Sequence, residues 1–286
     1  MPELPEVETT KRTLWHHLKG QMIAQVQVRT PRLRFVISPT IYHLKNQTVL
    51  ALQRRGKYLI WYLPSGKILF HLGMTGFFKI LPNYLPPGKH DHLDFCLQSG
   101  KIIRYNDVRR FGCCLWLNEG EESPLLTHLG VEPFSKELTV SYLQSCFAKR
   151  TVVIKVALMD ARLIVGVGNI YACESLFIAG IHPQTPVYLL LPKDLEKLIM
   201  AVRAVLTKAI EAGGSSIRDF KQPSGQLGYF VNSLKVYGRA GKTCLLCATT
   251  IEKTIIAGRS SFFCPHCQPK LLLNESADVK NPRKNN

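Results

Sequence analysis

Four cysteines near the end of the chain constrain its fold more than any other feature. Cys244 and Cys247 are separated by two residues, sixteen residues follow, and Cys264 and Cys267 repeat the same spacing. Two such pairs are typical of zinc knuckles, in which four thiolates complete a tetrahedron around the metal and leave no open position. The pattern therefore predicts one structural zinc ion, with His266 inside the second pair as a less favoured ligand.

The sixteen residues between the two pairs predict a hairpin whose tip is Gly258-Arg-Ser260. Taken by itself, Arg259 at this tip is either an ordinary surface arginine or a side chain aimed at a binding partner. The charge of the whole chain bears on that choice, because 37 basic and 20 acidic residues give a formal net charge of +17. Such an excess indicates a polyanionic partner, and nucleic acid fits better than a membrane because no amphipathic basic helix stands out.

Several features indicate a cytoplasmic protein with no membrane partner. No apolar run reaches the roughly 18 residues that a bilayer span requires. The acidic start of the chain is the opposite of the positively charged start of a signal peptide. The cysteines outside the two pairs are most simply reduced thiols, as in a cytosol; they are Cys96, Cys113, Cys114, Cys146 and Cys173.

The hydrophobic pattern divides the chain into a β part and a helical part, so the expected fold class is α+β. Residues 22–116 alternate like strands and contain two similar hairpins, 57–72 and 95–105, each turning at a Ser-Gly pair, which predicts one antiparallel β-sandwich. Helical spacing follows, most clearly over 193–212, which Gly213 and Gly214 end. We expect a β-sandwich over 1–130, a helical domain over 131–230, the zinc finger over 235–269 and a disordered tail over 270–286.

The first residues carry a chemical possibility. Pro2 follows the initiator, and a small second residue lets Met1 be removed, which would leave a secondary amine with a pKa of about 8. Such an amine can attack a sugar carbon and form a cationic iminium, and Glu3 beside it could move protons. Pro5 suits the first turn of a helix that would hold the amine still. The simpler interpretation is a helix start with ordinary acidic capping.

Three further groups have both a functional and a plain interpretation. Gly166-Val-Gly-Asn169 at a helix start predicts backbone N–H groups that hold a phosphate, or else a glycine-rich turn between packed helices. Lys155 interrupts an apolar run, and it either extends to solvent or faces a cleft. The histidines at 90 and 92 lack further metal ligands, so phosphate contact or plain surface is expected.

Jointly, these residues resemble those of bacterial formamidopyrimidine-DNA glycosylases, also called 8-oxoguanine DNA glycosylases. The resemblance runs in order from residue 1 to about 269 and ends with the four-cysteine finger. Its motifs are Pro2-Glu-Leu-Pro-Glu-Val-Glu8, Arg54-Arg-Gly-Lys-Tyr58, His71-Leu-Gly-Met-Thr-Gly76, Lys89-His-Asp-His92, Arg109-Arg-Phe-Gly112, Leu158-Met-Asp160, Gly166-Val-Gly-Asn-Ile-Tyr171 and Gly180-Ile-His-Pro183.

The resemblance implies an N-terminal β-sandwich, a helix-two-turn-helix domain with a zinc-finger β-hairpin, and damaged double-stranded DNA bound between them. It implies a monomeric, bifunctional enzyme of the bacterial cytoplasm, associated with the nucleoid. Such an enzyme excises oxidised purines through a Schiff base on Pro2 and nicks the abasic site by β,δ-elimination.

The same resemblance assigns roles to individual residues. Glu3 would be the acid that opens the sugar, Lys57 would support β-elimination, and Arg259 would serve δ-elimination. Residues that contact DNA would be His71, His90, Arg109, Arg150 and Asn169. Residues that fill the gap left by an extruded base would be Met74, Arg109 and Phe111. Residues of the pocket region would be Glu6, Lys155, Glu174 and, on a loop over about 213–228 that closes over the base, Arg218.

Two departures and two rivals accompany the resemblance. Val108 stands where the family usually has proline, so its loop is expected to be less rigid, and Arg150 replaces the commoner lysine. One rival is the related endonuclease VIII type, which removes oxidised pyrimidines; the Leu4-Pro-Glu6 continuation and the Arg109-Arg-Phe111 run favour the purine branch. The other rival is a non-enzymatic zinc-ribbon DNA-binding protein, which gives no reason for Pro2 and Glu3.

Overall fold

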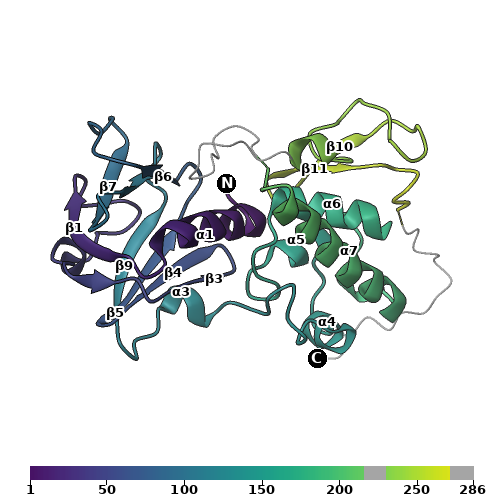
Figure 1. Cartoon of the computed structure of the whole chain (residues 1–286). Coiled ribbons are helices and arrows are strands. Elements are labelled where there is room, and N and C mark those ends of the chain that lie inside the picture. Colours follow the sequence, from purple (N-terminus) through teal and green to yellow (C-terminus); the bar gives the residue numbers. More distant parts are fainter. Residues whose placement is uncertain (216–229, 271–286) are drawn as a thin grey trace.

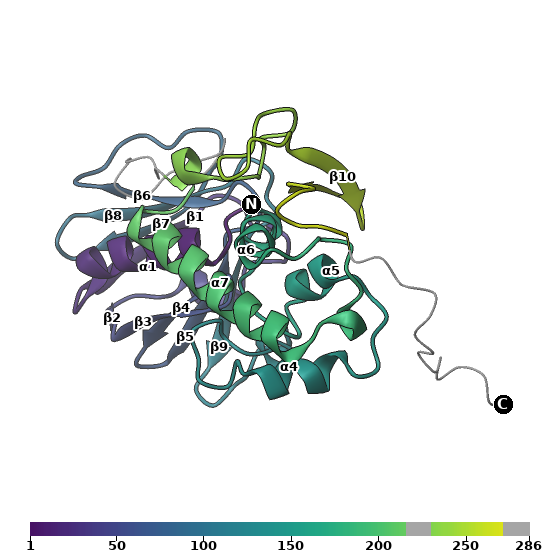
Figure 2. The same cartoon turned by 90° about the vertical axis from the view of Figure 1, so that its right-hand side faces the viewer.

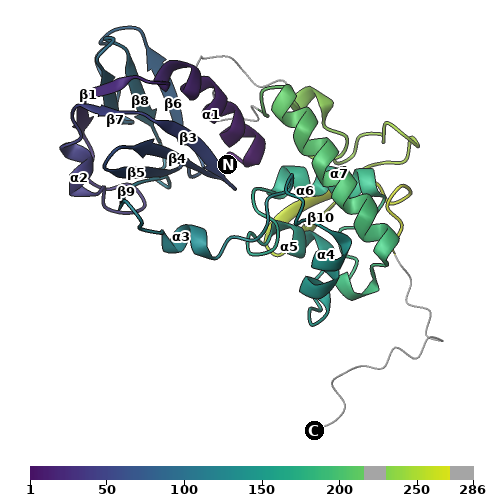
Figure 3. The ribbon, with the colours of Figure 1, turned by 60° about the horizontal axis from the view of Figure 1, so that its bottom comes forward.

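The computed structural model describes residues 1–215 and 230–270 (Figure 1). They form a β lobe and a helical lobe, with the N-terminus of the chain lying between the two (Figures 1 and 3). A two-stranded hairpin lies above the helices in the view of Figure 1. The predicted α+β class, with antiparallel sheets, a helical domain and a zinc-finger hairpin, is confirmed. Arg218 and the predicted tail beyond residue 270 lie outside the described residues.

The β lobe is a sandwich of two antiparallel sheets. One sheet has the order β2-β1-β7-β8-β6 and the other β3-β4-β5-β9. Large side chains from both sheets fill the space between them, with Trp61 in contact with Phe70, Phe78 and Phe95. The strands are β1 (Met22–Val28), β2 (Gln47–Thr48), β3 (Ala51–Arg55), β4 (Tyr58–Leu63), β5 (Gly66–His71), β6 (Phe77–Leu81), β7 (Asp91–Leu97), β8 (Ile102–Asn106) and β9 (Cys113–Asn118), and a short helix α2 (Pro39–Tyr42) adjoins them.

Helix α1 (Leu4–Leu18) joins the two lobes. Leu4 lies in the core of the helical lobe, whereas Val7, Leu14 and Leu18 lie in the core of the sandwich. The side chain of Glu6 accepts a hydrogen bond from the backbone N–H of Glu3, which closes the first turn of the helix. Because one helix belongs to both cores, the residues just before it are held at the boundary between the lobes.

The helical lobe is built around α7, whose predicted apolar stripe is confirmed. Every residue of that stripe is buried, from Leu195 through Ala209, and α7 packs against α6. Gly180 ends α6 in the left-handed conformation at φ 69°. The helices are α3 (Pro124–Thr127), α4 (Val140–Phe147), α5 (Ile154–Met159), α6 (Asn169–Ala179), η1 (Val187–Leu189), α7 (Pro192–Glu211) and η2 (Phe230–Ser233).

The finger contributes the hairpin of β10 (Glu252–Ile256) and β11 (Arg259–Phe263), which lies beside α6 and α5 (Figure 2). Its turn is two residues, Ala257 at φ 47° and Gly258 at φ 71°, the arrangement that suits a tight hairpin. Arg259 is therefore the first strand residue after the turn, paired with Ile256. None of the helices in the described ranges is long and apolar enough to cross a membrane.

Candidate active site and zinc site

Glu3 is held by the start of α6. Its carboxylate accepts hydrogen bonds from the backbone N–H groups of Gly168 (2.7 Å) and Ile170 (3.0 Å). Only glycine fits at 168, because a Cβ there would lie 2.3 Å from the Glu3 carboxyl carbon. The group that accepts hydrogen bonds from this helix start is thus a carboxyl group of the chain itself. Because these two N–H groups bind Glu3, the predicted phosphate contact at this helix start would use Asn169, and it stays a prediction.

Burial dominates the protonation of Glu3. It raises the pKa of this carboxyl above its usual value, and the nearby Glu6 carboxylate adds to the rise. The positive charge of Lys57 and the two backbone hydrogen bonds act in the opposite direction and are outweighed. A raised pKa favours the protonated form of a carboxyl group, which is the form that a general acid requires.

Lys57 lies next to Glu3 at the edge of the sandwich. Its ammonium donates to the carbonyl of Val167 (3.4 Å), in the turn that precedes α6. Burial lowers the pKa of Lys57, the carboxylates of Glu3 and Glu6 raise it, and the guanidinium of Arg259 lowers it further. The hairpin tip of the finger and the edge of the sandwich are therefore close enough for their charges to interact.

Glu6, predicted for the pocket region, has its carboxylate fully engaged. One oxygen accepts from Glu3 N–H (2.8 Å), and the other accepts from the Tyr171 hydroxyl (2.6 Å) and from Ser215 N–H (2.7 Å) and its hydroxyl (2.9 Å). Glu6 thereby ties α1 to α6 and to the segment that follows α7. No sequence signal pointed to Ser215, because nothing local marks it as a partner of a residue 209 positions earlier.

Pro2 precedes this network directly. Pro2 is buried, whereas Met1 is 47% exposed. The N-terminus lies between the β lobe and the helical lobe (Figure 1). The structure thus brings Pro2, Glu3 and Lys57 together with the charge of Arg259 nearby.

His71 is neutral at physiological pH. Its pKa is lowered from 6.5 to about 4, mainly by burial and further by the charges of Lys57 and Arg34. Its Nδ1 accepts from Gly73 N–H (2.9 Å), so the ring proton resides on Nε2. Any contact from His71 to a ligand therefore uses a neutral N–H donor.

Two adjoining loops of the β lobe carry the predicted void-filling residues. The loop of residues 72–76 holds Met74, which is half-buried, and the loop of residues 107–112 holds Arg109 and Phe111, which are exposed. The Arg109 guanidinium lies 4.5 Å from the centre of the Phe111 ring. The structure thus brings these side chains to one edge of the sandwich.

A polar bridge fixes these two loops to each other. The Thr75 hydroxyl donates to Asp107 (2.6 Å) and accepts from Arg109 N–H (3.0 Å), while Asp107 also accepts from Gly112 N–H (2.8 Å). Gly73 adopts φ 65°, and a Cβ there would lie 2.4 Å from Gly112 N. The close approach of the loops therefore requires glycine at 73. The sequence did not single out Thr75 or Asp107.

The other predicted DNA contacts lie on separate elements. His90 is half-buried in the turn before β7, and Arg150 forms an ion pair with Asp160 (3.1 Å). Asn169 donates from its amide to the carbonyl of Ser260 (2.9 Å) on the finger hairpin. These contacts leave the DNA roles of the three residues as predictions.

Lys155 and Glu174, predicted for the pocket region, bind main chain. Lys155 is buried and donates to the Ser260 carbonyl (3.2 Å) and to the Ser261 hydroxyl. Glu174 accepts from the backbone N–H groups that lead into the finger, those of Lys235, Val236 and Tyr237, at 2.8–3.0 Å. Burial raises the pKa of Glu174 and lowers that of Lys155.

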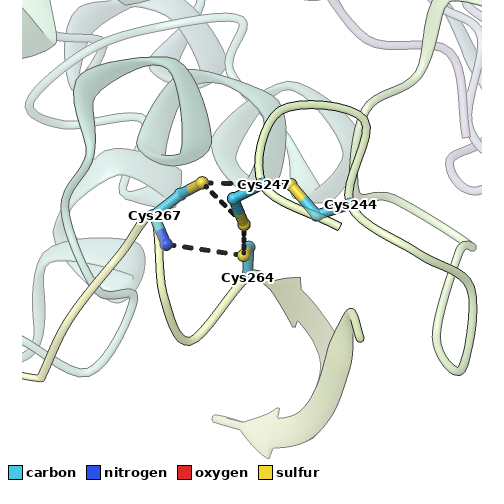
Figure 4. Close-up of side chains that lie close together, drawn as sticks. All are labelled: Cys244, Cys247, Cys264 and Cys267. Carbon is cyan, nitrogen blue, oxygen red and sulfur yellow. Dashed lines mark hydrogen bonds between the residues drawn. The ribbon is translucent and has the colours of Figure 1, made fainter. Parts of the chain in front are cut away.

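The four predicted zinc ligands converge (Figure 4). Their sulfur atoms all lie within 4.8 Å of one another, with Cys247 at 3.4 Å from both Cys264 and Cys267, and Cys244 at 3.9 Å from Cys267. Tetrahedral zinc with Zn–S bonds of about 2.3 Å requires sulfur separations of about 3.8 Å, so the site fits the ion. The backbone N–H groups of Leu246 and Cys267 point to sulfur atoms, as in zinc knuckles.

Comparisons with known proteins agree with this geometry. Three family models match in order: the formamidopyrimidine-DNA glycosylase N-terminal domain over residues 1–114, the helix-two-turn-helix domain of the same enzymes over 129–221, and the zinc finger found in these glycosylases and isoleucyl-tRNA synthetases over 241–270. Formamidopyrimidine-DNA glycosylase of Escherichia coli is 50% identical over 268 residues, covering 94% of this chain and all of the relative. The chain belongs to the formamidopyrimidine-DNA glycosylase family.

Solved structures of the family have the same fold. The glycosylase of Lactococcus lactis, as a mutant in complex with DNA containing Fapy-dG, superposes with a TM-score of 0.87 at 35% identity, covering 94% of this chain and all of that one. The MutM protein of Thermus thermophilus gives a TM-score of 0.83 at 38% identity, covering 93% of this chain and 98% of that one.

Membership in the family sets the activity. As a formamidopyrimidine-DNA glycosylase, the protein is a bifunctional DNA glycosylase and abasic-site lyase of base-excision repair, it acts on oxidised purines in DNA, and it holds one structural zinc ion. The rival interpretation as a non-enzymatic zinc ribbon is therefore wrong, because the family models cover the β lobe and the helical lobe as well as the finger.

Proposed function

We propose that Pro2, once Met1 is removed, is the nucleophile of this glycosylase and Glu3 its acid. The Pro2 nitrogen forms a bond to C1′ with its lone pair, the glycosidic bond breaks as the base leaves with its electron pair, and the proton that the Pro2 nitrogen loses goes to the departing base. Glu3 gives a proton to O4′ when the C1′–O4′ bond opens, which leaves a cationic iminium. The observation that carries this proposal is the buried carboxyl of Glu3, fixed by Gly168 and Ile170 next to Pro2.

Strand cleavage follows from the iminium. It accepts electrons when a proton leaves C2′ and the bond to the 3′ phosphate breaks, and a second elimination expels the 5′ phosphate. Lys57 supports the first elimination and binds a phosphate, and Arg259 supports the second. The charge interaction between Lys57 and Arg259 supports this arrangement, because a phosphate between two cations would bind both.

DNA would run along the boundary of the two lobes. His71, His90, Arg109, Arg150 and Asn169 contact it, and Met74, Arg109 and Phe111 occupy the gap left by the extruded base. Glu6, Lys155, Glu174 and Arg218 belong to the pocket region. The enzyme works as a monomer in the cytoplasm at the nucleoid, with a sandwich over 1–130, a DNA-binding helical domain over 131–230 and the finger over 235–269.

The lesions would be 8-oxoguanine and formamidopyrimidines. One structural relative supports a broader range, since wild-type Lactococcus lactis glycosylase, at 34% identity and a TM-score of 0.86, was solved with DNA containing an oxidised pyrimidine. Single-turnover excision from duplexes with 8-oxoguanine or with thymine glycol compares the purine and pyrimidine branches. Faster removal of thymine glycol would contradict our assignment and favour the endonuclease VIII type.

Reduction with borohydride tests the nucleophile. Hydride addition to the iminium should link the protein covalently to lesion-containing DNA, and the crosslinked peptide should begin at Pro2. A matched protein with a Gly-Ser leader before Pro2 has no free amine at that position, so its trapping should fall by at least about a thousandfold while it still binds DNA. Undiminished trapping by the leader protein would assign the nucleophile to another residue.

A further inference from the structure

Lys155 is an unusual residue for its surroundings. It lies on the short helix α5 with 1% of its surface exposed, and no carboxylate of the described residues pairs with it. A buried ammonium needs hydrogen-bond acceptors, because losing water costs several kcal/mol otherwise. Two acceptors are on the zinc-finger hairpin, the carbonyl of Ser260 at 3.2 Å and the hydroxyl of Ser261, and the thiol of Cys173 on α6 also interacts with the ammonium.

The Ser261 hydroxyl extends this contact by one step. It accepts from Lys155 and donates to the carbonyl of Arg259 (3.1 Å), so the ammonium reaches the main chain of Arg259 through one hydroxyl. Asn169, the first residue of α6, donates to the same Ser260 carbonyl at 2.9 Å. Lys155 on α5 and Asn169 on α6 therefore bind β11 directly after its first residue, Arg259.

Arg259 needs such support. It is exposed and follows the two-residue turn directly, and its cross-strand partner Ile256 is the last residue of β10. The zinc ion would hold the opposite end of this hairpin, because Cys264 follows β11. Without the helical contacts, the turn end of the hairpin would depend on the strand pairing alone.

The location of Arg259 relative to Lys155 completes the geometry. Both line a cavity of about 310 Å³ together with Val156, Asp160 and Ile256. The charge of Arg259 lowers the pKa of Lys155 further, after the larger effect of burial. The two cations are thus neighbours, yet the hydrogen bonds of Lys155 to the hairpin go to the Ser260 carbonyl and the Ser261 hydroxyl.

We propose that Lys155 is a positioning residue, which sets the location of the Arg259 guanidinium through Ser260 and Ser261. Its role is then in strand cleavage at the 5′ phosphate, and it does not require contact with the damaged base. This inference rests on the proposed function of Arg259. The alternative is a direct contact between Lys155 and the damaged base. A positioning role affects cleavage of a substrate without a base, whereas a direct contact affects only a substrate that contains the base.

The test uses duplex DNA with a ready-made abasic site, which has no base to contact. The measured quantity is the ratio of δ- to β-elimination product in a single turnover of the full-length zinc enzyme. Lys155→Met removes the ammonium while keeping an unbranched side chain, and Ser261→Ala breaks the relay while leaving Lys155 in place. We expect both variants to lower the ratio by about fivefold or more, with any loss in borohydride trapping smaller than that.

Double variants that also carry Arg259→Ala distinguish an effect through Arg259 from an independent effect. If Lys155 acts through Arg259, adding Lys155→Met or Ser261→Ala to Arg259→Ala should produce no further fall in the ratio. Losses that multiply, or a Lys155→Met defect confined to excision of 8-oxoguanine, would overturn the inference. A wild-type ratio in Arg259→Ala alone would instead refute the proposed function of Arg259.

Zinc content and melting temperature are measured to detect any effect of each substitution on folding. If Lys155→Met loses zinc or fails to fold, the inference is tested with Ser261→Ala, because this substitution removes only the one hydroxyl group on β11. A wild-type product ratio in well-folded Ser261→Ala would then overturn the relay from Lys155 to Arg259.

Discussion

The proposed catalytic centre and the proposed void-filling edge of this enzyme are built in opposite ways. Glu3 is 3% exposed, and its carboxylate is bound by backbone amides of another lobe. Phe111, in contrast, is 46% exposed on a loop of the β lobe, and its ring contacts the Arg109 guanidinium. The first region is held in place by hydrogen bonds between the lobes, whereas the second presents exposed apolar and cationic side chains.

This difference follows from the two tasks. Transfer of a proton requires a group held in place with a tuned pKa, which burial and fixed N–H groups provide. Insertion into a stack of nucleobases requires a side chain that extends from the protein surface, on loops that are fixed to each other where they leave the sheets. In this protein the hydrogen bond from Thr75 to Asp107 fixes the two loops to each other, and the side chains that would enter the base stack are Met74, Arg109 and Phe111. The two regions should therefore fail on different substrates.

The largest effect is expected for Glu3→Gln. The amide keeps the size of the side chain but cannot donate the proton to O4′, so excision of 8-oxoguanine should fall by about 10²–10⁴-fold in single-turnover assays. The loss should be the same when the lesion lies in an unpaired bubble, because stacking does not affect the proton transfer. Trapping at a ready-made abasic site should fall far less.

A control for Glu3→Gln addresses its hydrogen bonds to Gly168 and Ile170. Glu174→Gln makes the same chemical change in another buried carboxylate that accepts backbone N–H groups. If Glu174→Gln were as inactive as Glu3→Gln at equal melting temperature, loss of a structural anion would explain the defect, and the acid role would have to be given up.

Met74→Ala should have the next largest effect, with a different dependence on substrate. Opening a duplex costs a few kcal/mol, which a wedge partly offsets, so excision from paired DNA should fall by about 10–100-fold. In a bubble the base is already unstacked, and most of the loss should disappear. Equal losses in duplex and bubble would show that Met74 supports the fold instead of the base stack.

The sequence was sufficient for the fold and for the four zinc ligands, and the other site residues stay predictions. Local patterns marked the hairpins, α7 and the zinc ligands, because period, turn residues and cysteine spacing all act within short segments. The motifs of the family located Pro2, Glu3, Lys57 and Arg259. Those patterns do not reveal which group a polar side chain binds when that group lies in another lobe.

The phosphate predicted at the start of α6 illustrates this limit. A glycine-rich helix start indicates a group that accepts hydrogen bonds from the backbone N–H groups, and the group found there is the carboxyl of Glu3, 165 residues earlier in the chain. Lys155 is a second case, since an interrupted apolar run cannot reveal that the ammonium meets Ser260 and Ser261, 105 and 106 residues later. In both cases the charge was apparent from sequence and the partner was not.

Substitution of His71 should have the smallest effect, because this residue lies between the two regions. His71 pairs with Tyr58, the neighbour of Lys57, across β4 and β5, it precedes the loop of residues 72–76, and its pKa of about 4 keeps it neutral. A neutral donor releases no counterion, so removing it with His71→Ala should leave the salt dependence of DNA binding unchanged. Affinity should fall by less than about tenfold, and His71→Gln should restore most of it because its amide also donates.

The same lowered pKa predicts a dependence of stability on pH. The unfolded chain binds a proton at His71 near pH 6.5, whereas the folded protein resists it until about pH 4. The unfolded state therefore holds more protons between these values, and stability falls as the pH drops through this window. In His71→Gln the decline in melting temperature from pH 6.5 to 4 should be shallower than in the wild type. An unchanged decline would mean that His71 has the same pKa in the folded and the unfolded chain. A salt slope that changes by about one unit in His71→Ala would mean that His71 binds DNA as a cation.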